Sequence, residues 1–118
     1  LILSHTALSD RPSPWTRLIT SDHARAIASI GGVVGIWPVQ QVANVSSYAE
    51  AIARMVDVIG VDHVGIGTDQ LGLLGPSSLP SYADLPQLAA ALQAKFNAAD
   101  VAKLLGGNYR RVFEACLA

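Results

Sequence analysis

The sequence is poor in charge, in cysteine and in aromatic side chains. Only 14% of its 118 residues are charged, 51% are hydrophobic, and the formal net charge is −1. Arg110 and Arg111 form an isolated basic pair rather than a stripe, so we expect no nucleic acid as a partner. The single cysteine, Cys116, excludes an internal disulfide framework. Its place on the last expected helix favours a buried, unreactive thiol.

Long apolar runs are also missing. The longest uncharged stretch, residues 26–49, is interrupted by Gly31, Gly32, Pro38 and Asn44, which argues against a transmembrane segment. Residues 1–4 are too short for the apolar core of a secretory leader and carry no basic segment. We therefore expect a soluble protein, with the cytoplasm favoured as its location.

Short apolar segments alternate with helical patterns along the chain. Residues 1–4, 33–37 and 63–67 are apolar runs of strand length. The middle run is continuous and rich in branched residues, which is typical of a buried parallel strand. Hydrophobic spacing and end signals predict helices over 21–30, 47–59, 84–96, 97–106 and 108–117. Ser47 and Glu50 have the spacing of a capping box, and Asn108 is expected to cap the last helix.

This alternation of strands and helices predicts parallel βαβ units. The first apolar run resembles a strand already in progress, and three parallel strands would leave two open edges. A complete (β/α)₈ barrel needs eight units and roughly 250 residues. The sequence therefore predicts an α/β fold, namely the last three βα units of a (β/α)₈ TIM-type barrel plus C-terminal helices. Residues 1–118 would be the C-terminal part of one domain whose N-terminal part is absent.

Polar residues follow two of the expected strands. His5 comes directly after the first strand, and Thr68 and Asp69 come after the third. In parallel α/β folds the active site lies at these carboxyl ends. A histidine and an aspartate at one edge suit a metal ligand and a proton-transfer group, although either residue alone is more often structural.

Several motifs follow one another along the chain. They are residues 4–6, an arginine about a dozen residues later, Asp22 at a helix start, and residues 31–36, 63–72 and 105–113. Each motif is weak alone, but their order and spacing over nearly the whole chain are specific. Together they resemble the membrane (renal) dipeptidase family of zinc peptidases.

The resemblance implies a binuclear zinc site on a (β/α)₈ barrel that cleaves dipeptides or related small amides. His5 then takes the place of a histidine that binds one of the two zinc ions, as neutral imidazole does well. Arg17 matches an arginine that holds the substrate carboxylate, which suits its planar fork. Arg11 is a weaker candidate for that role. Asp69 matches an aspartate that shuttles the proton between water and the leaving amine.

The sequence departs from the family in two respects. The motif after the third strand usually reads Asp-Phe-Asp-Gly, but Gln70 and Leu71 replace its second and third residues, which leaves substrate specificity open. The family's other zinc ligands come from earlier strands that are not in this chain. One histidine and one aspartate cannot hold two zinc ions. We therefore expect the 118 residues alone to be inactive, and expect the rest of the barrel or a second chain, including a homodimer, as the partner.

The remaining aromatic and histidine residues are interpreted as structural. His23 lies within an expected helix and His63 near the start of a strand, so both are expected to be structural or solvated. Trp15 and Trp37 are expected to pack, although Trp37 ends the middle strand and could line the pocket.

Two other functions stay open at this point. The chain could be a catalytically inactive fragment that associates through its apolar faces. It could also be part of a barrel that binds phosphate, but neither Gly31-Gly32 nor Gly65–Gly67 lies at a strand-to-helix turn as a phosphate loop would. A phosphate-like ion at the helix start near Asp84 would favour that reading.

Overall fold

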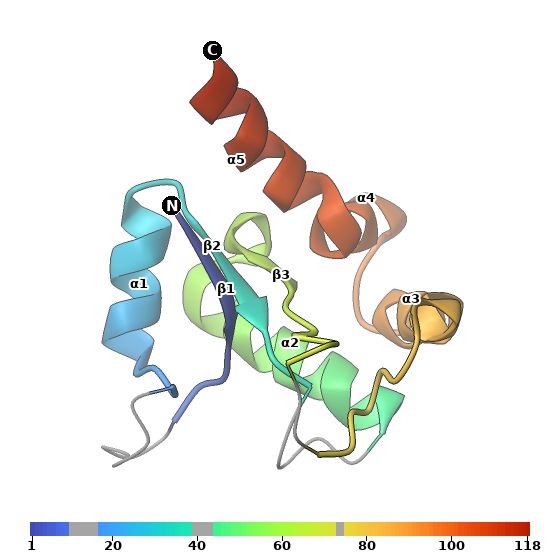
Figure 1. Ribbon diagram of the computed structural model, residues 1–118. Helices are drawn as coiled ribbons and strands as arrows, with labels where there is room; N and C mark the ends of the chain where they lie inside the picture. The colour runs from blue at the N-terminus through green and yellow to red at the C-terminus, as the bar shows by residue number, and fades with distance from the viewer. Residues whose placement is uncertain (10–16, 39–43, 73–74) are drawn as a thin grey trace.

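A three-stranded parallel sheet organises the chain (Figure 1). The computed structural model describes residues 1–9, 17–38, 44–72 and 75–118. The strands are β1 (Ile2–Thr6), β2 (Val33–Ile36) and β3 (Val64–Ile66), and they lie in the order β1-β2-β3. Helix α1 (Ser21–Ser29) connects β1 to β2, and α2 (Val45–Ile59) connects β2 to β3. The two predicted βαβ connections are therefore confirmed.

Further helices follow the sheet. They are α3 (Leu85–Gln93), α4 (Ala98–Ala102) and α5 (Asn108–Leu117), with short helical turns at Val61–His63, Tyr82–Asp84 and Lys103–Gly107. Figure 1 shows α1 beside β1 and β2, and α3 to α5 on the other side, beyond β3. No helix in these described ranges is long and apolar enough to cross a membrane.

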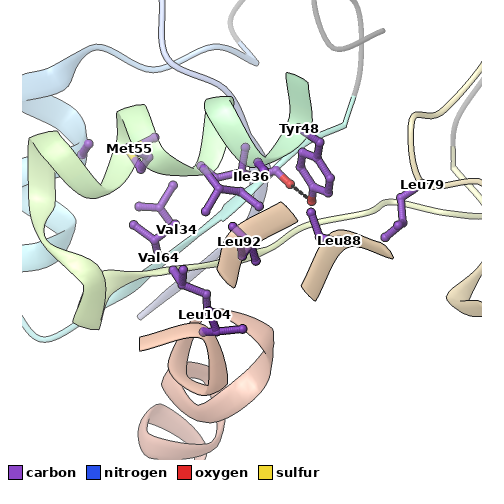
Figure 2. Close-up of a cluster of buried hydrophobic side chains, with 13 residues drawn as sticks. Val34, Ile36, Tyr48, Met55, Val64, Leu79, Leu88, Leu92 and Leu104 are labelled. Carbon is purple, nitrogen blue, oxygen red and sulfur yellow. Dashed lines mark hydrogen bonds between the residues drawn. The ribbon is translucent and has the colours of Figure 1, made fainter. Parts of the chain in front are cut away.

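The core lies between the sheet and α2. Figure 2 shows Val34, Ile36 and Val64 of the strands beside Met55 of α2, all of them buried. Ile52 of α2 is buried in the same cluster. Their positions follow the two-residue period of strands and the three- to four-residue period of helices. Buried leucines of the later helices complete the cluster: Leu88, Leu92 and Leu104. Apolar periodicity thus fixes which face of each element is covered.

The start of α2 differs from the sequence-based prediction, whereas the start of α4 agrees with it. The N-cap of α2 is Asn44, whose side-chain oxygen accepts a hydrogen bond from the Ser47 backbone N–H at 2.9 Å. The capping box expected from Ser47 and Glu50 is therefore wrong, and Glu50 instead pairs with Lys95 of the segment after α3. Asn97 does cap α4, by accepting from the Asp100 N–H at 2.9 Å.

Asn108 was expected to cap the last helix, and this expectation is also wrong. It is buried as the first residue of α5 and donates its amide to the carbonyls of Val61 at 2.7 Å and Val64 at 2.8 Å. Asn108 thus fastens α5 to the start of β3. Buried carbonyls need such partners, so tertiary demand outweighs the local capping preference of asparagine.

The outer end of α5 is more open than the sequence indicated. Cys116 is exposed, so its expected burial is wrong. Phe113 and Leu117 of the same helix are exposed as well, because in the described structure α5 contacts the sheet and the turn before it through its first half. The apolar side chains Phe113 and Leu117 are therefore not covered by other residues of the described structure.

Candidate active site

His5 and Asp69 lie together at the carboxyl edge of the sheet. The His5 Nε2 and Asp69 Oδ2 atoms are 3.7 Å apart. The strand register between β1 and β2 shifts between Leu3 and Thr6, so the chain bulges where His5 lies. A bulge turns side chains away from the regular alternation of a strand. The sequence-based expectation that these residues share one edge is confirmed by this distance.

Two glycines give this arrangement the space it needs. A Cβ atom on Gly67 would lie 2.3 Å from the Ser4 carbonyl oxygen, so the bulge in β1 fits only beside a residue without a side chain. A Cβ atom on Gly72 would lie 2.2 Å from the Asp69 carboxylate. Neither distance is possible between non-bonded atoms. At Gly67 the clash is with backbone, so a glycine is required there, whereas at Gly72 the Asp69 side chain would have to move.

Asp69 has a left-handed backbone, with φ of 46°. This conformation is uncommon outside glycine, asparagine and aspartate, and it concentrates at functional sites. The Asp69 carbonyl accepts a hydrogen bond from the Gly72 N–H at 2.9 Å, which closes a tight turn directly after β3. The Gln70 amide donates to the Pro80 carbonyl at 2.8 Å, so the following loop is tied back to this turn.

The two ring nitrogens of His5 have different neighbours. Its Nδ1 atom is 2.8 Å from the Ser4 hydroxyl, and a metal-binding histidine usually has such a partner on its second nitrogen. Its Nε2 atom faces Asp69 at 3.7 Å, which is longer than a hydrogen bond. With the ring proton on Nδ1, the Nε2 lone pair would be free to bind a metal ion. Within the described ranges no three histidine, cysteine, aspartate or glutamate residues gather to hold a metal ion.

Arg17 is anchored by its backbone near the same edge. The buried Thr6 hydroxyl donates to the Arg17 carbonyl at 2.6 Å. Two residues later Ile19 pairs with Leu8 as an isolated parallel bridge. The chain therefore returns to the end of β1 at Arg17. Arg11, the weaker candidate, lies outside the described residues, as does Trp15.

Trp37 connects Arg17 to His5. Its ring centroid is 5.7 Å from that of His5, at an interplanar angle of 60°. The Arg17 guanidinium carbon lies over the same indole, 5.7 Å from its centroid, within the range of a cation–π contact. Trp37 follows β2 directly, and its backbone N–H donates to the Thr6 carbonyl at 2.8 Å. Its suggested place beside the site is therefore supported.

The other two histidines take no part in this site. The His63 Nδ1 atom is 2.9 Å from the Gly32 carbonyl, at the opposite end of the strands, and His23 is exposed on α1. Both were expected to be structural or solvated, and this is confirmed. Gly72 and Thr6 lie in the matching motifs, but sequence analysis assigned neither a role in the site, because their roles depend on contacts that only the fold creates.

The fold and site define a parallel α/β protein with a histidine, a carboxylate and an arginine at the carboxyl edge of its sheet. The model of the membrane dipeptidase family (peptidase family M19) matches residues 1–117. The chain therefore belongs to that family, as its motifs indicated.

Two curated relatives are similar to most of this chain. A dipeptidase of Aspergillus terreus, ataJ, is 32% identical over 97% of the chain and 30% of its own length. An uncharacterised protein of Klebsiella pneumoniae, from the pqqA 5′ region, is 30% identical over 86% of the chain and 41% of its own length. The chain thus spans well under half of either relative.

Solved structures share the fold. A metallopeptidase of Rhodobacter sphaeroides, bound to a phosphinate mimic of L-Ala-D-Ala, has a TM-score of 0.81 and 23% identity over 96% of this chain and 35% of its own. An amidohydrolase of Pseudomonas aeruginosa has a TM-score of 0.78 and 23% identity over 95% of this chain and 44% of its own. At these identities the likeness concerns the fold alone.

Proposed function

We propose that this chain is the C-terminal part of a zinc-dependent dipeptidase whose (β/α)₈ barrel and remaining zinc ligands are supplied by residues outside it. The observation that carries the proposal is the 3.7 Å approach of His5 to Asp69 at the carboxyl edge of the sheet. Membership of the membrane dipeptidase family supports it. The substrate class is the dipeptide, with related small amides as further candidates.

In this proposal His5 binds one of two zinc ions through Nε2. The Ser4 hydroxyl then accepts from Nδ1–H and fixes the tautomer. Among the described residues His5 is the ligand at this edge, with Asp69 beside it at 3.7 Å, so the pair fits a zinc site that needs further ligands from outside the described residues. Bound zinc supplies Lewis-acid activation of water and of the amide carbonyl.

Asp69 is the proposed proton carrier. Its carboxylate is held beside His5 by the left-handed turn, where it can take a proton from the attacking water and deliver it to the leaving amine nitrogen. Arg17 would bind the C-terminal carboxylate of the dipeptide by two parallel N–H···O bonds. Together these residues orient the substrate and move one proton, while the bond cleavage itself needs the completed metal site.

The test uses the full-length gene product with zinc bound. Its length is first established by denaturing intact mass, because a species of 12.3 kDa would lack the other ligands. Asp69→Asn should lower kcat for L-Ala-D-Ala by about 10²- to 10⁴-fold with zinc content unchanged. Asp57→Asn, an exposed position on α2, is the matched control and should keep full activity. Retained turnover in Asp69→Asn would refute the proposed proton transfer.

A second candidate is a catalytically inactive fragment that acts by association. Leu71, Ile30 and Leu117 favour it, because these large apolar side chains are exposed in the described structure, and such surface promotes contact with a partner. A second copy of the chain or the rest of a barrel would cover them. The intact-mass measurement separates the two candidates, since only a longer or complemented chain can form the complete zinc site.

A further inference from the structure

Trp37 occupies a position between two groups that the proposed function uses for different tasks. Its ring lies 5.7 Å from that of His5, the proposed zinc ligand. Its face also lies 5.7 Å from the Arg17 guanidinium carbon, the proposed carboxylate-binding group. Tryptophan attracts a cation over its face more strongly than tyrosine or phenylalanine does.

Thr6 forms hydrogen bonds with the backbones of both Arg17 and Trp37. Thr6 donates its hydroxyl to the Arg17 carbonyl at 2.6 Å and accepts the Trp37 N–H at its own carbonyl at 2.8 Å. The backbone of Arg17 is therefore fixed, but its long side chain is exposed and would otherwise sample many rotamers. Contact with the face of the Trp37 indole would restrict the rotamers of the Arg17 side chain.

The indole nitrogen gives an independent indication. The Trp37 Nε1 atom is buried and has no hydrogen-bond partner in the part of the chain that the structure describes. A buried, unsatisfied donor costs about 1–3 kcal/mol, and phenylalanine would fill much of the same space without that cost. Within the described part of the chain, the packing of the indole therefore comes with a cost that phenylalanine would not carry.

We propose that Trp37 is a positioning residue that holds the Arg17 guanidinium for the free C-terminal carboxylate of the dipeptide. This inference rests on the proposed function and adds a determinant of substrate specificity to it. Loss of the indole face would release the guanidinium and weaken capture of the carboxylate. Because the indole also lies 5.7 Å from the His5 ring, the zinc content of each variant shows whether the proposed ligand has moved as well.

The experiment uses the zinc-loaded full-length enzyme and two substrates, L-Ala-D-Ala and its C-terminal amide. Trp37→Leu should raise KM for the free dipeptide by about 2- to 30-fold, with kcat little changed. The amide, which lacks the carboxylate, should show an unchanged kcat/KM. Trp37→Phe should restore much of the loss, because it keeps an aromatic face. Phe113→Leu, an exposed aromatic position on α5, is the control and should have no effect.

A double variant tests whether Trp37 acts through Arg17. Arg17→Ala combined with Trp37→Leu should bind the free dipeptide no more weakly than Arg17→Ala alone, because both substitutions remove the same interaction. Additive losses, or an equal rise of KM for both substrates, would overturn the proposal and leave Trp37 as a packing residue. Zinc content and thermal unfolding identify any variant that has failed to fold. If Trp37→Leu fails to fold, the KM values of Trp37→Phe for the two substrates test the proposal instead.

Binding of D-alanine provides a measurement that does not need turnover. Calorimetric titration should show weaker binding to Trp37→Leu than to the parent protein. If the parent hydrolyses no dipeptide but this difference is present, the proposed hydrolase fails and the positioning role stands. If the parent is active and neither KM nor D-alanine affinity changes in Trp37→Leu, the positioning role fails and the hydrolase stands.

Discussion

At the scale of single residues, the site depends on where side chains are missing as much as on where they are present. Gly72 leaves room for the Asp69 carboxylate, because a Cβ atom there would come within 2.2 Å of it. Gly72→Ala should therefore displace the proposed proton carrier. A misplacement of about 1 Å can cost roughly 10²-fold in rate, and we expect kcat for L-Ala-D-Ala to fall by about that factor.

Gly75→Ala is the control for this substitution. A Cβ atom on Gly75 meets nothing within 4 Å, so the variant should retain the parent's rate. Steady-state kinetics with both variants at equal zinc content make the comparison. Equal kcat values for Gly72→Ala and the parent would show that the Asp69 carboxylate does not need its present position.

Tyr48 is a buried residue whose hydroxyl has a definite partner. It donates to the Ile36 carbonyl at 2.6 Å (Figure 2), and burial raises the pKa of Tyr48 well above its ordinary value. The same carbonyl also accepts the Gly67 N–H at 2.9 Å, so it keeps one bond when the hydroxyl is removed. Tyr48→Phe should therefore lower the free energy of unfolding by only about 1 kcal/mol.

Denaturant unfolding of Tyr48→Phe measures this loss. Tyr82→Phe serves as the control, because Tyr82 is exposed and its hydroxyl is expected to contribute little. A loss of several kcal/mol in Tyr48→Phe would contradict the account, since it would mean that the Ile36 carbonyl is left unsatisfied.

At the scale of elements, Tyr109 joins α5 to the sheet. Its hydroxyl donates to the Ile66 carbonyl at 3.0 Å, and its ring covers Gly65, where a Cβ atom would lie 2.5 Å from it. Burial raises the pKa of Tyr109 to about 12, above the ordinary value of about 10 for an unfolded chain. The unfolded state therefore ionises first. The stability from this group is complete below pH 10 and is lost as the pH rises towards 12.

The stability difference between Tyr109→Phe and the parent should become smaller as the pH rises. At pH 8 it should be less stable than the parent by about 1 kcal/mol, because the hydrogen bond is gone. Between about pH 10 and 12 the parent should lose stability more steeply than the variant, so the difference narrows. The contribution of Tyr48 is common to both proteins, so it cancels in the comparison. Unfolding free energies measured at pH 8 and pH 11 test this, and a constant difference would contradict it.

Sequence patterns predict elements better than they predict contacts between elements. The strands and helices follow from apolar periodicity, which depends on neighbours along the chain. The bulge at His5 does not, because it exists only beside β2 and Gly67. Asn108 was interpreted as a cap for the same reason, since its real partners, the carbonyls of Val61 and Val64, are more than forty residues away.

Site residues could be predicted from the sequence where they follow a strand that the sequence also predicts. His5 and Asp69 follow apolar runs, so their place at one edge could be inferred before their 3.7 Å separation was known. The contact of Arg17 with Trp37 could not be inferred, because it depends on how the segment after β1 returns to the sheet. Exposure of Cys116 was missed because helix position alone does not say which faces are covered.

At the scale of the whole molecule, this chain spans 30% and 41% of two curated relatives. The core behind the sheet is dense and continuous, whereas apolar side chains such as Ile30 and Leu117 stay exposed. A binuclear zinc site needs donors beyond His5. The proposed hydrolysis would therefore be a property of a larger assembly, to which this chain would contribute one part of the active site.

The most direct test of this account is the zinc content of the full-length protein and of its His5→Ala variant, measured by elemental analysis at known protein concentration. His23→Ala, which changes an exposed histidine on α1, is the matched control. The account predicts two zinc ions per chain in the parent and control, and loss of about one ion in His5→Ala, together with loss of dipeptide hydrolysis. Equal zinc content in all three proteins would contradict it, because His5 would then not be a ligand.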